Sequence, residues 1–181
     1  CDESGVALGL AYSNLESLSA AIDQRRGIYW SRKRGLWMKG ETSGNHQELI
    51  RVNVDCDRDT LRFTVRQEGN FCHLGTRTCW GEGSGMSNLY RRLQLRLNDA
   101  PAGSYTKRLI DDPELLESKL LEEARELSQA TDASQACEEA ADLLYFALVR
   151  LIAAGGDLNI VEKVLDRRSL NVTRRRGDAK Q

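Results

Sequence analysis

The stretch "ELIRVNVDCDRDTLRFTVRQEG", residues 48–69, decides the fold of the first half of the chain. Apolar and polar residues alternate in "ELIRVNVDCD" and again in "TLRFTVRQEG". This period of two is typical of half-buried strands, because successive side chains of a strand point to opposite faces. Since the two runs are joined through "DRDT", the stretch predicts neighbouring antiparallel strands.

The rest of the first half adds a helix to this hairpin. Residues 15–26, "LESLSAAIDQRR", carry a helical stripe of Leu15, Leu18, Ala21 and Ile22, with Asn14 as a candidate N-cap. Up to about residue 80 the chain is rich in Gly, β-branched and aromatic residues. We therefore expect this half to be α+β, with mainly antiparallel sheet.

The second half changes to a helical period. Residues 112–130 open with Asp-Pro, which is common at helix starts, and residues 134–156 and 157–169 predict two further helices. No strand signal follows residue 80, so the fold class is α+β, with an antiparallel N-terminal domain followed by an all-α domain. We place these domains at residues 1–97 and 107–181, with a linker at 98–106 where Pro101 and Gly103 interrupt both periods.

Composition limits the classes of function. The 181 residues carry a formal charge of -1, which argues against a broad affinity for nucleic acid. Six Arg and Lys against two Asp collect in residues 166–181, a run that is more often a solvated terminus. No stretch approaches the roughly 20 apolar residues of a membrane span. Five irregularly spaced cysteines do not resemble a disulfide scaffold, which favours a reducing compartment. From charge, apolar stretches and cysteines together, we expect a soluble, cytoplasmic protein without membrane or nucleic-acid partners.

Three aspartates lie at every second position in the centre of the hairpin. On a strand, Asp55, Asp57 and Asp59 would form a row on one face, with Cys56 and Arg58 on the other. Such a row costs stability unless a cation or a positively charged ligand lies among the carboxylates. The pattern therefore predicts a cation site.

Three cysteines lie close together in the same region. Cys72 and Cys79 are seven positions apart, and Cys56 precedes Cys72 by sixteen. Three thiolates that leave one position open to water are a common way to hold a catalytic zinc, although buried inert cysteines are an equal alternative from spacing alone. His73 is a candidate zinc ligand or acid–base group, or a structural residue.

Residues 29–45, "YWSRKRGLWMKGETSGN", contain candidate phosphate contacts. Arg32, Arg34 and Lys39 supply cations, and the backbone N–H groups of the small "GETSGN" loop can approach a phosphate closely. On composition alone, a charged hairpin with a glycine turn is the more common interpretation.

These three motifs, in their order and spacing, resemble the phosphoribosyl-AMP cyclohydrolase family over about residues 5–80. The resemblance implies that Cys56, Cys72 and Cys79 hold Zn²⁺ and that Asp55, Asp57 and Asp59 hold Mg²⁺. It implies that His73 is catalytic and that substrate is bound by Arg32, Arg34, Trp37, Lys39, Glu41, Thr42, Ser43, Gly44 and Asn45.

The same resemblance implies a reaction and a partner. Phosphoribosyl-AMP carries ribosyl groups on N1 and N9 of adenine, and hydrolysis opens the N1–C6 bond. A zinc-activated water would attack C6, as in zinc deaminases. The resemblance also implies a homodimer, because members of this family share each zinc site between the two subunits.

A second acidic cluster is expected on two helices. "LLEEARELSQA" places Glu122, Glu123 and Glu126 within one turn, and "EEAADLLYF" adds Glu139 and Asp142. A solvated acidic face is the usual interpretation of such a pattern. Facing acids at the edge of a packed core would instead need Mg²⁺ to neutralise them.

The pattern "EExxE" followed by "ExxD" is similar to the all-α, MazG-like nucleotide pyrophosphohydrolases, and over about residues 104–170 the chain resembles phosphoribosyl-ATP pyrophosphohydrolase. This implies Mg²⁺ ligands at Glu122, Glu123, Glu126, Glu139 and Asp142, a catalytic role for Glu123, and phosphate contacts from Lys119 and Arg168. Many members of the family it resembles have His where Phe146 stands, and if that His is catalytic there, this domain would be slower or would use another group.

Together the two resemblances imply a bifunctional hydrolase of histidine biosynthesis that acts on phosphoribosyl-ATP and then on phosphoribosyl-AMP. The usual first strand is missing, and "RRSLNVTRRRGDAK" resembles the junction to a histidinol dehydrogenase domain in fungal trifunctional proteins, so we expect an excised middle region. One alternative is a house-cleaning nucleotide pyrophosphohydrolase with a non-catalytic zinc domain. Another is a scaffold module whose structural zinc is closed by a fourth ligand such as His73.

Overall fold

A computed structural model describes residues 1–169, and the chain divides into two compact units, Cys1–Asn88 and a second that begins at Leu89. Most of the basic run at residues 166–181, predicted to be a solvated terminus, and most of the expected dehydrogenase junction lie at residues 170–181, outside the described residues. The first unit contains α1 (Leu15–Gln24) and the strands, and the second is helical, so the α+β class is confirmed.

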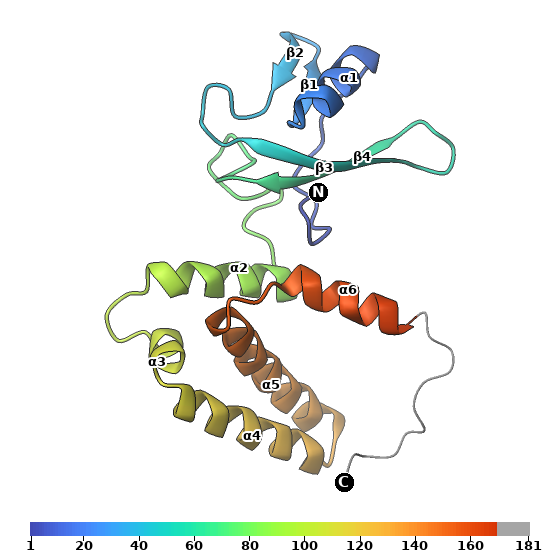
Figure 1. Cartoon of the computed structure of the whole chain (residues 1–181). Coiled ribbons are helices and arrows are strands. Elements are labelled where there is room, and N and C mark those ends of the chain that lie inside the picture. Colours follow the sequence, from blue (N-terminus) through green and yellow to red (C-terminus); the bar gives the residue numbers. More distant parts are fainter. Residues whose placement is uncertain (170–181) are drawn as a thin grey trace. The chain divides into compact units, whose positions relative to one another are not determined.

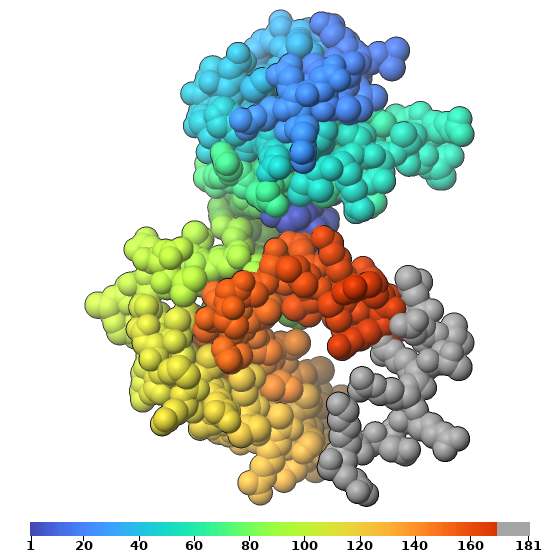
Figure 2. All heavy atoms as spheres, viewed as in Figure 1, coloured from blue at the N-terminus to red at the C-terminus, as the bar shows by residue number. Residues whose placement is uncertain are grey.

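The central hairpin of the first unit is confirmed. β3 (Gln47–Val54) pairs antiparallel with β4 (Leu61–Gln67), from Gln47 opposite Gln67 to Val54 opposite Leu61 (Figure 1). A second antiparallel pair forms from β1 (Ile28–Ser31) and β2 (Gly35–Met38), and Gly35 takes a left-handed φ of 75° where the chain leaves the turn. The hairpin of β3 and β4 projects from the rest of the first unit (Figure 2).

The predicted N-cap of α1 is confirmed. The Asn14 side chain accepts a hydrogen bond from the backbone N–H of Ser17, and the Ser17 hydroxyl accepts one from the Asn14 backbone N–H. The predicted stripe is only partly buried, because Ala21 is fully enclosed whereas Leu15 is 86% exposed. The core of this unit consists of Leu8, Ala21, Ile28, Tyr29, Leu49, Phe63 and Val65.

The three predicted helices of the second unit are present as α4 (Pro113–Gln129), α5 (Ala133–Ala153) and α6 (Leu158–Ser169). Asp112 and Asp132 cap α4 and α5, each accepting a hydrogen bond from the backbone N–H three residues later. The connection between α4 and α5 is short, so the two helices pack side by side as a hairpin (Figure 1).

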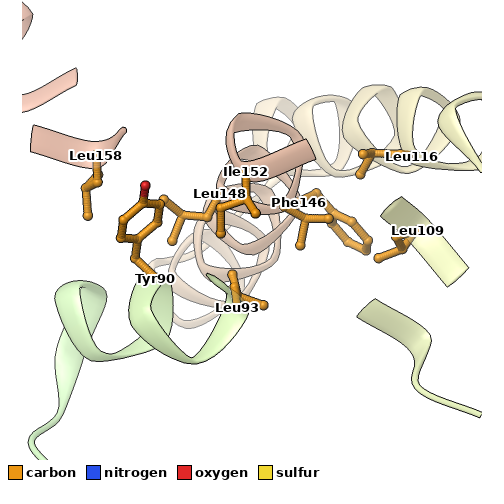
Figure 3. Close-up of a cluster of buried hydrophobic side chains, with 9 residues drawn as sticks. Tyr90, Leu93, Leu109, Leu116, Phe146, Leu148, Ile152 and Leu158 are labelled. Atoms are coloured by element: carbon orange, nitrogen blue, oxygen red, sulfur yellow. The ribbon is translucent and has the colours of Figure 1, made fainter. Parts of the chain in front are cut away.

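Two helices were not predicted: α2 (Gly85–Asn98) and α3 (Tyr105–Asp111). Tyr90 and Leu93 of α2 and Leu109 of α3 are buried with Phe146 of α5 in the core of the second unit (Figure 3). The other members of this core are Leu116, Leu148, Val149, Ile152 and Leu158. Residues 98–106, which were expected to link the domains, run from the end of α2 to the start of α3, and both helices contribute to the core of the second unit. α2 begins before the division between the two units.

Among the described residues, no single helix has the length and apolar composition needed to cross a membrane. Helices α5 and α6 reach that length and composition only as a pair, and the pair is bent by 115°.

Candidate metal and substrate sites

The three aspartates gather in the loop that joins β3 to β4. Asp55, Asp57 and Asp59 each offer a carboxylate oxygen, and these oxygens lie within 4.8 Å of one another. The prediction that they alternate along a strand is wrong, because β3 ends at Val54 and Arg58 adopts a left-handed φ of 65° that turns the chain. The gathering comes from the turn rather than from strand periodicity.

Hydrogen bonds hold this loop in place. The backbone N–H of Thr60 donates to Asp55 Oδ1 at 3.0 Å, and the Thr60 hydroxyl donates to Asp59 Oδ1 at 2.8 Å. The bond from the Thr60 backbone is the main reason that the pKa of Asp55 is lowered. A cluster of exposed carboxylates is the kind of oxygen ligand set that fits Mg²⁺.

Cys72 and Cys79 lie close together in the loop that follows β4. Cys72 is buried, and hydrogen bonds from the Leu74 backbone and the Thr76 side chain lower the pKa of its thiol. Burial and the neighbouring Cys72 raise the pKa of Cys79. The chemistry of this pair fits zinc, which binds thiolate sulfur strongly.

Cys56 does not join this pair within one chain. It is exposed in the aspartate loop, and no group of three metal-binding side chains in residues 1–169 contains a cysteine. One copy of the chain thus brings together two of the three predicted zinc ligands. His73 is exposed beside the pair, with its Nδ1 4.0 Å from Cys72 Sγ.

Two residues that the sequence did not single out hold the cysteine loop. Nη1 of Arg77 donates to the carbonyls of Gln67 and Gly69 at 3.0 and 3.3 Å, and Nη2 lies 3.5 Å from Asp2 Oδ2. At Gly9 an added Cβ would collide with the Phe71 ring and lie 2.9 Å from Cys79 Sγ. Arg77 could have been noticed in the sequence, because it is a charged residue between Cys72 and Cys79. Nothing in the sequence indicates the close approach of Gly9 to Phe71 and Cys79.

The candidate substrate residues of the first unit differ in exposure. Arg32 and Arg34 are exposed around the β1–β2 turn, where their guanidinium groups lie over the rings of Tyr12 and Trp37 at 4.7 and 5.3 Å. Lys39 is buried, with 6% exposure. Residues 41–44 form an exposed loop, which ends at the partly buried Asn45 and contains Gly44 with a φ of 73°.

Three of the five helical acids converge. Glu123 and Glu126 of α4 and Glu139 of α5 offer oxygens within 4.8 Å of one another, and Glu123 is only 5% exposed. Burial, with Glu126 as the next cause, raises the pKa of Glu139. Such a set of carboxylates fits a divalent cation with oxygen ligands. Glu122 and Asp142 lie outside this group, although Asp142 also acts on Glu139.

Lys119 neutralises part of this acidic group. Its Nζ lies 2.8 Å from Glu122 Oε1 and 3.0 Å from Glu123 Oε1, and these two hydrogen bonds raise the pKa of the lysine. The same Nζ is 5.6 Å from the ring centre of Phe146. Phe146 therefore packs in the core and presents its ring to the lysine.

A groove of about 420 Å³ runs along α4 beside these acids. It is lined by Glu122 and Glu126 and by four residues that the sequence did not single out, namely Ser118, Leu121, Arg125 and Gln129. Arg168, predicted to contact phosphate, is exposed in the last turn of α6. The roles assigned to all these residues remain predictions.

Comparison with known proteins gives two family matches. The model of phosphoribosyl-AMP cyclohydrolase matches residues 9–81, and that of phosphoribosyl-ATP pyrophosphohydrolase matches residues 86–169. The histidine biosynthesis bifunctional protein HisIE of Wolinella succinogenes is 36% identical over 190 residues, covering 91% of this chain and 83% of that protein.

Two fungal relatives are more similar but much longer. The histidine biosynthesis bifunctional protein his7 of Schizosaccharomyces pombe is 51% identical over 180 residues, covering 99% of this chain and 43% of that protein. The histidine biosynthesis trifunctional protein of Neurospora crassa is 50% identical over 179 residues, covering 99% of this chain and 21% of that protein. The chain therefore spans less than half the length of these two relatives.

Proposed function

This chain belongs to the family of histidine biosynthesis bifunctional proteins, and we propose that it hydrolyses phosphoribosyl-ATP to phosphoribosyl-AMP and pyrophosphate and then opens the adenine ring of the product. One observation carries the proposal: each family match contains its own group of side chains of the kinds that can bind a metal ion. The cyclohydrolase match contains the cysteine pair and the three aspartates, and the pyrophosphohydrolase match contains Glu123, Glu126 and Glu139.

Ring opening is assigned to the first unit. Cys72, Cys79 and Cys56 would hold zinc, which when bound supplies a water that loses its proton near neutral pH. His73, which lies beside Cys72, would carry a proton to or from the purine. The hydrolysis adds water across the N1–C6 bond, so C6 becomes a carboxamide carbon and N1 leaves with the added proton.

The phosphates of phosphoribosyl-AMP are assigned to the cations and turns of the same unit. The exposed Arg32 and Arg34 are free to form charge-assisted hydrogen bonds to phosphate oxygens. The Glu41–Asn45 loop offers backbone N–H and hydroxyl donors, and Trp37 offers a ring face. Asp55, Asp57 and Asp59 would hold Mg²⁺, which when bound offsets phosphate charge.

Pyrophosphate release is assigned to α4 and α5. Glu122, Glu123, Glu126, Glu139 and Asp142 would hold Mg²⁺, which when bound neutralises the triphosphate and activates water. Glu123, the most buried of these acids, would orient or deprotonate the attacking water. Lys119, once its acidic partners bind metal, and Arg168 would contact phosphate oxygens.

The separation of Cys56 from the cysteine pair supports a homodimer with a shared zinc site. The expected outcome is complementation: mixed preparations of the inactive Cys56→Ala and Cys72→Ala variants regain about a quarter of the ring-opening activity, because half of a random mixture is hybrid and each hybrid has one intact site. The measurement is ring opening after unfolding and refolding the two variants together. No recovery, with refolded unaltered protein active, contradicts the shared site.

The two activities are tested with purified protein, Zn²⁺ and Mg²⁺. Phosphoribosyl-ATP is supplied, and pyrophosphate and the ultraviolet change on purine ring opening are followed together. Cys72→Ala is expected to abolish ring opening but keep pyrophosphate release, and Glu123→Gln is expected to do the reverse when phosphoribosyl-AMP is supplied directly. Losses of about a hundredfold or more are expected for each.

Matched controls are available on the same elements. Cys137→Ala removes an exposed cysteine of α5 outside the ligand set, and Glu117→Gln removes an exposed glutamate of α4, so both should retain both activities. Hydrolysis of ordinary dNTPs with no ring opening despite bound zinc would favour the house-cleaning pyrophosphohydrolase instead.

A further inference from the structure

Lys39 is a buried cation without an acidic partner. It directly follows β2, its residue exposure is 6%, and among residues 1–169 no carboxylate forms an ion pair with it. Its Nζ makes two long hydrogen-bond contacts, at 3.5 Å each, to the carbonyl oxygens of Asn45 and Asn70. An ammonium group removed from water needs a compensating charge, and two distant carbonyls supply little of it.

The cysteine pair lies near this lysine and would be negatively charged as thiolates on zinc. The Lys39 Nζ lies 5.3 Å from the ring centre of Phe71, the residue before Cys72. Phe71 and Cys79 both flank Gly9, so the ring and the sulfur line the same spot. Burial lowers the pKa of Lys39, and Cys79 and then Cys72 oppose that effect, which places both thiols within electrostatic reach of the ammonium.

We propose that Lys39 is the fixed counter-charge of the Cys72–Cys79 pair, and that its ammonium strengthens zinc binding by these thiolates. The proposal rests on the zinc site proposed above. Three thiolates exceed the charge of Zn²⁺ by one unit, so the filled site is an anion, and a buried ammonium nearby balances it. This role differs from the phosphate contact that the sequence predicted for Lys39, since a buried ammonium is poorly placed to receive a charged substrate.

The test measures zinc affinity, not activity, on the whole chain. Competition with a chromophoric chelator gives the zinc dissociation constant of the unaltered protein and of Lys39→Met, Lys39→Gln and Lys39→Arg. Met removes both the charge and the donor, Gln keeps a donor for the carbonyls, and Arg keeps the charge. We expect Met and Gln each to weaken zinc binding by about tenfold or more, and Arg to recover most of that loss.

Two controls separate charge from general damage. Lys33→Met removes an exposed lysine of the same unit and should leave the zinc affinity unchanged. Leu49→Ala opens the core of this unit without removing a charge, so it reports how far lost stability alone weakens zinc binding. Thermal unfolding of each metal-free variant measures its loss of stability, with which its change in zinc affinity is compared.

The outcomes are distinct. If folded Lys39→Gln binds zinc as tightly as the unaltered protein, Lys39 serves only the carbonyls and the proposal is overturned. The Lys39→Gln variant tests the proposal even if the Lys39→Met variant fails to fold. If Lys39→Gln weakens zinc no more than Leu49→Ala at equal loss of stability, the counter-charge is likewise overturned. If the unaltered protein binds no zinc, the proposed zinc site itself fails, which is a different result from loss of zinc in the Lys39 variants alone.

Discussion

At the scale of single residues, Lys119 supplies a positive charge beside the helical acids. The carboxylate of Glu123 is nearly buried and lies within reach of Glu126 and Glu139, and the Lys119 ammonium supplies the adjacent positive charge. The ring centre of Phe146 lies 5.6 Å from that ammonium. The lysine therefore compensates part of the charge that Mg²⁺ would neutralise.

Replacement of Lys119 by Met should destabilise the metal-free protein. The change leaves Glu123 buried beside two other acids, and loss of a partner from a buried charged group costs about 1–3 kcal/mol. Urea unfolding without divalent metal measures the cost, and added Mg²⁺ should restore much of the loss. Lys107→Met removes a more exposed pair with Asp111 and should cost about 0.5 kcal/mol or less. Equal costs for the two variants would contradict the argument.

The sequence predicted correctly that some of these acidic residues form groups. It identified the Asp55–Asp59 acids and Glu123, Glu126 and Glu139 as groups, because acids at spacings of two, three or four positions can converge in either a turn or a helix. It could not find the buried setting of Lys39, because its neighbours Asn70 and Phe71 are about thirty positions away. Contacts of that separation depend on the fold.

At the scale of elements, the site of the second unit depends on the hairpin of α4 and α5. Glu139 belongs to α5 and meets Glu123 and Glu126 of α4 only because the two helices pack side by side. Their packing brings like charges together and raises the pKa of Glu139 through burial and through Glu126. Without metal, the hairpin thus carries an electrostatic cost that depends on pH.

This cost predicts a pH dependence of stability. Because its pKa is higher in the folded than in the unfolded protein, Glu139 binds a proton more tightly when folded, so metal-free stability should fall as pH rises through the raised pKa. Glu139→Gln cannot ionise and should be the more stable protein at neutral pH without metal. Thermal unfolding from about pH 4 to 7 tests this, with the exposed neighbour Glu138→Gln as control.

Added Mg²⁺ should reverse the order of these two proteins. The unaltered chain gains stability by binding metal through Glu139, and Glu139→Gln gains less because it has lost a charged ligand. If Mg²⁺ stabilises both proteins equally, Glu139 is not a ligand.

The helices and strands were predictable where the periodic pattern of apolar residues continues over many residues. α4, α5 and α6 and the β3–β4 hairpin have sustained periods and clear ends, and all four were found. α3 has seven residues, too few to display a helical period. α2 has an apolar stripe of Leu89, Tyr90 and Leu93, but three arginines in the same helix weaken the pattern. The aspartates were assigned to a strand because alternation continues past Val54, where the chain already turns.

At the scale of the whole molecule, each unit has its own hydrophobic core. One core lies among α1, β1 and the β3–β4 hairpin, and the other lies among α2 to α6. Each family match falls largely on one unit. The domain limits of 1–97 and 107–181 remain a prediction, and the separate cores make the two proposed activities separable by mutation.

A core mutation in the second unit should therefore affect one activity first. Leu109 is completely buried, and Leu109→Ala should lower the stability of the helical unit by about 2–5 kcal/mol. On heating, pyrophosphate release should be lost at a lower temperature than in the unaltered protein, while opening of added phosphoribosyl-AMP keeps its original temperature limit. Leu49→Ala in the first unit should give the opposite order. A shared shift of both activities would mean that the units unfold together.

The tight fit at Gly9 has a consequence for how variation in this protein is interpreted. A single added carbon there would press on Phe71 and on the sulfur of Cys79, although glycine has no side chain with which to bind metal or substrate. In a genetic selection for histidine prototrophy, Gly9 should therefore score as intolerant as the cysteines themselves. A position essential for growth can thus be one whose only contribution is the space it leaves empty.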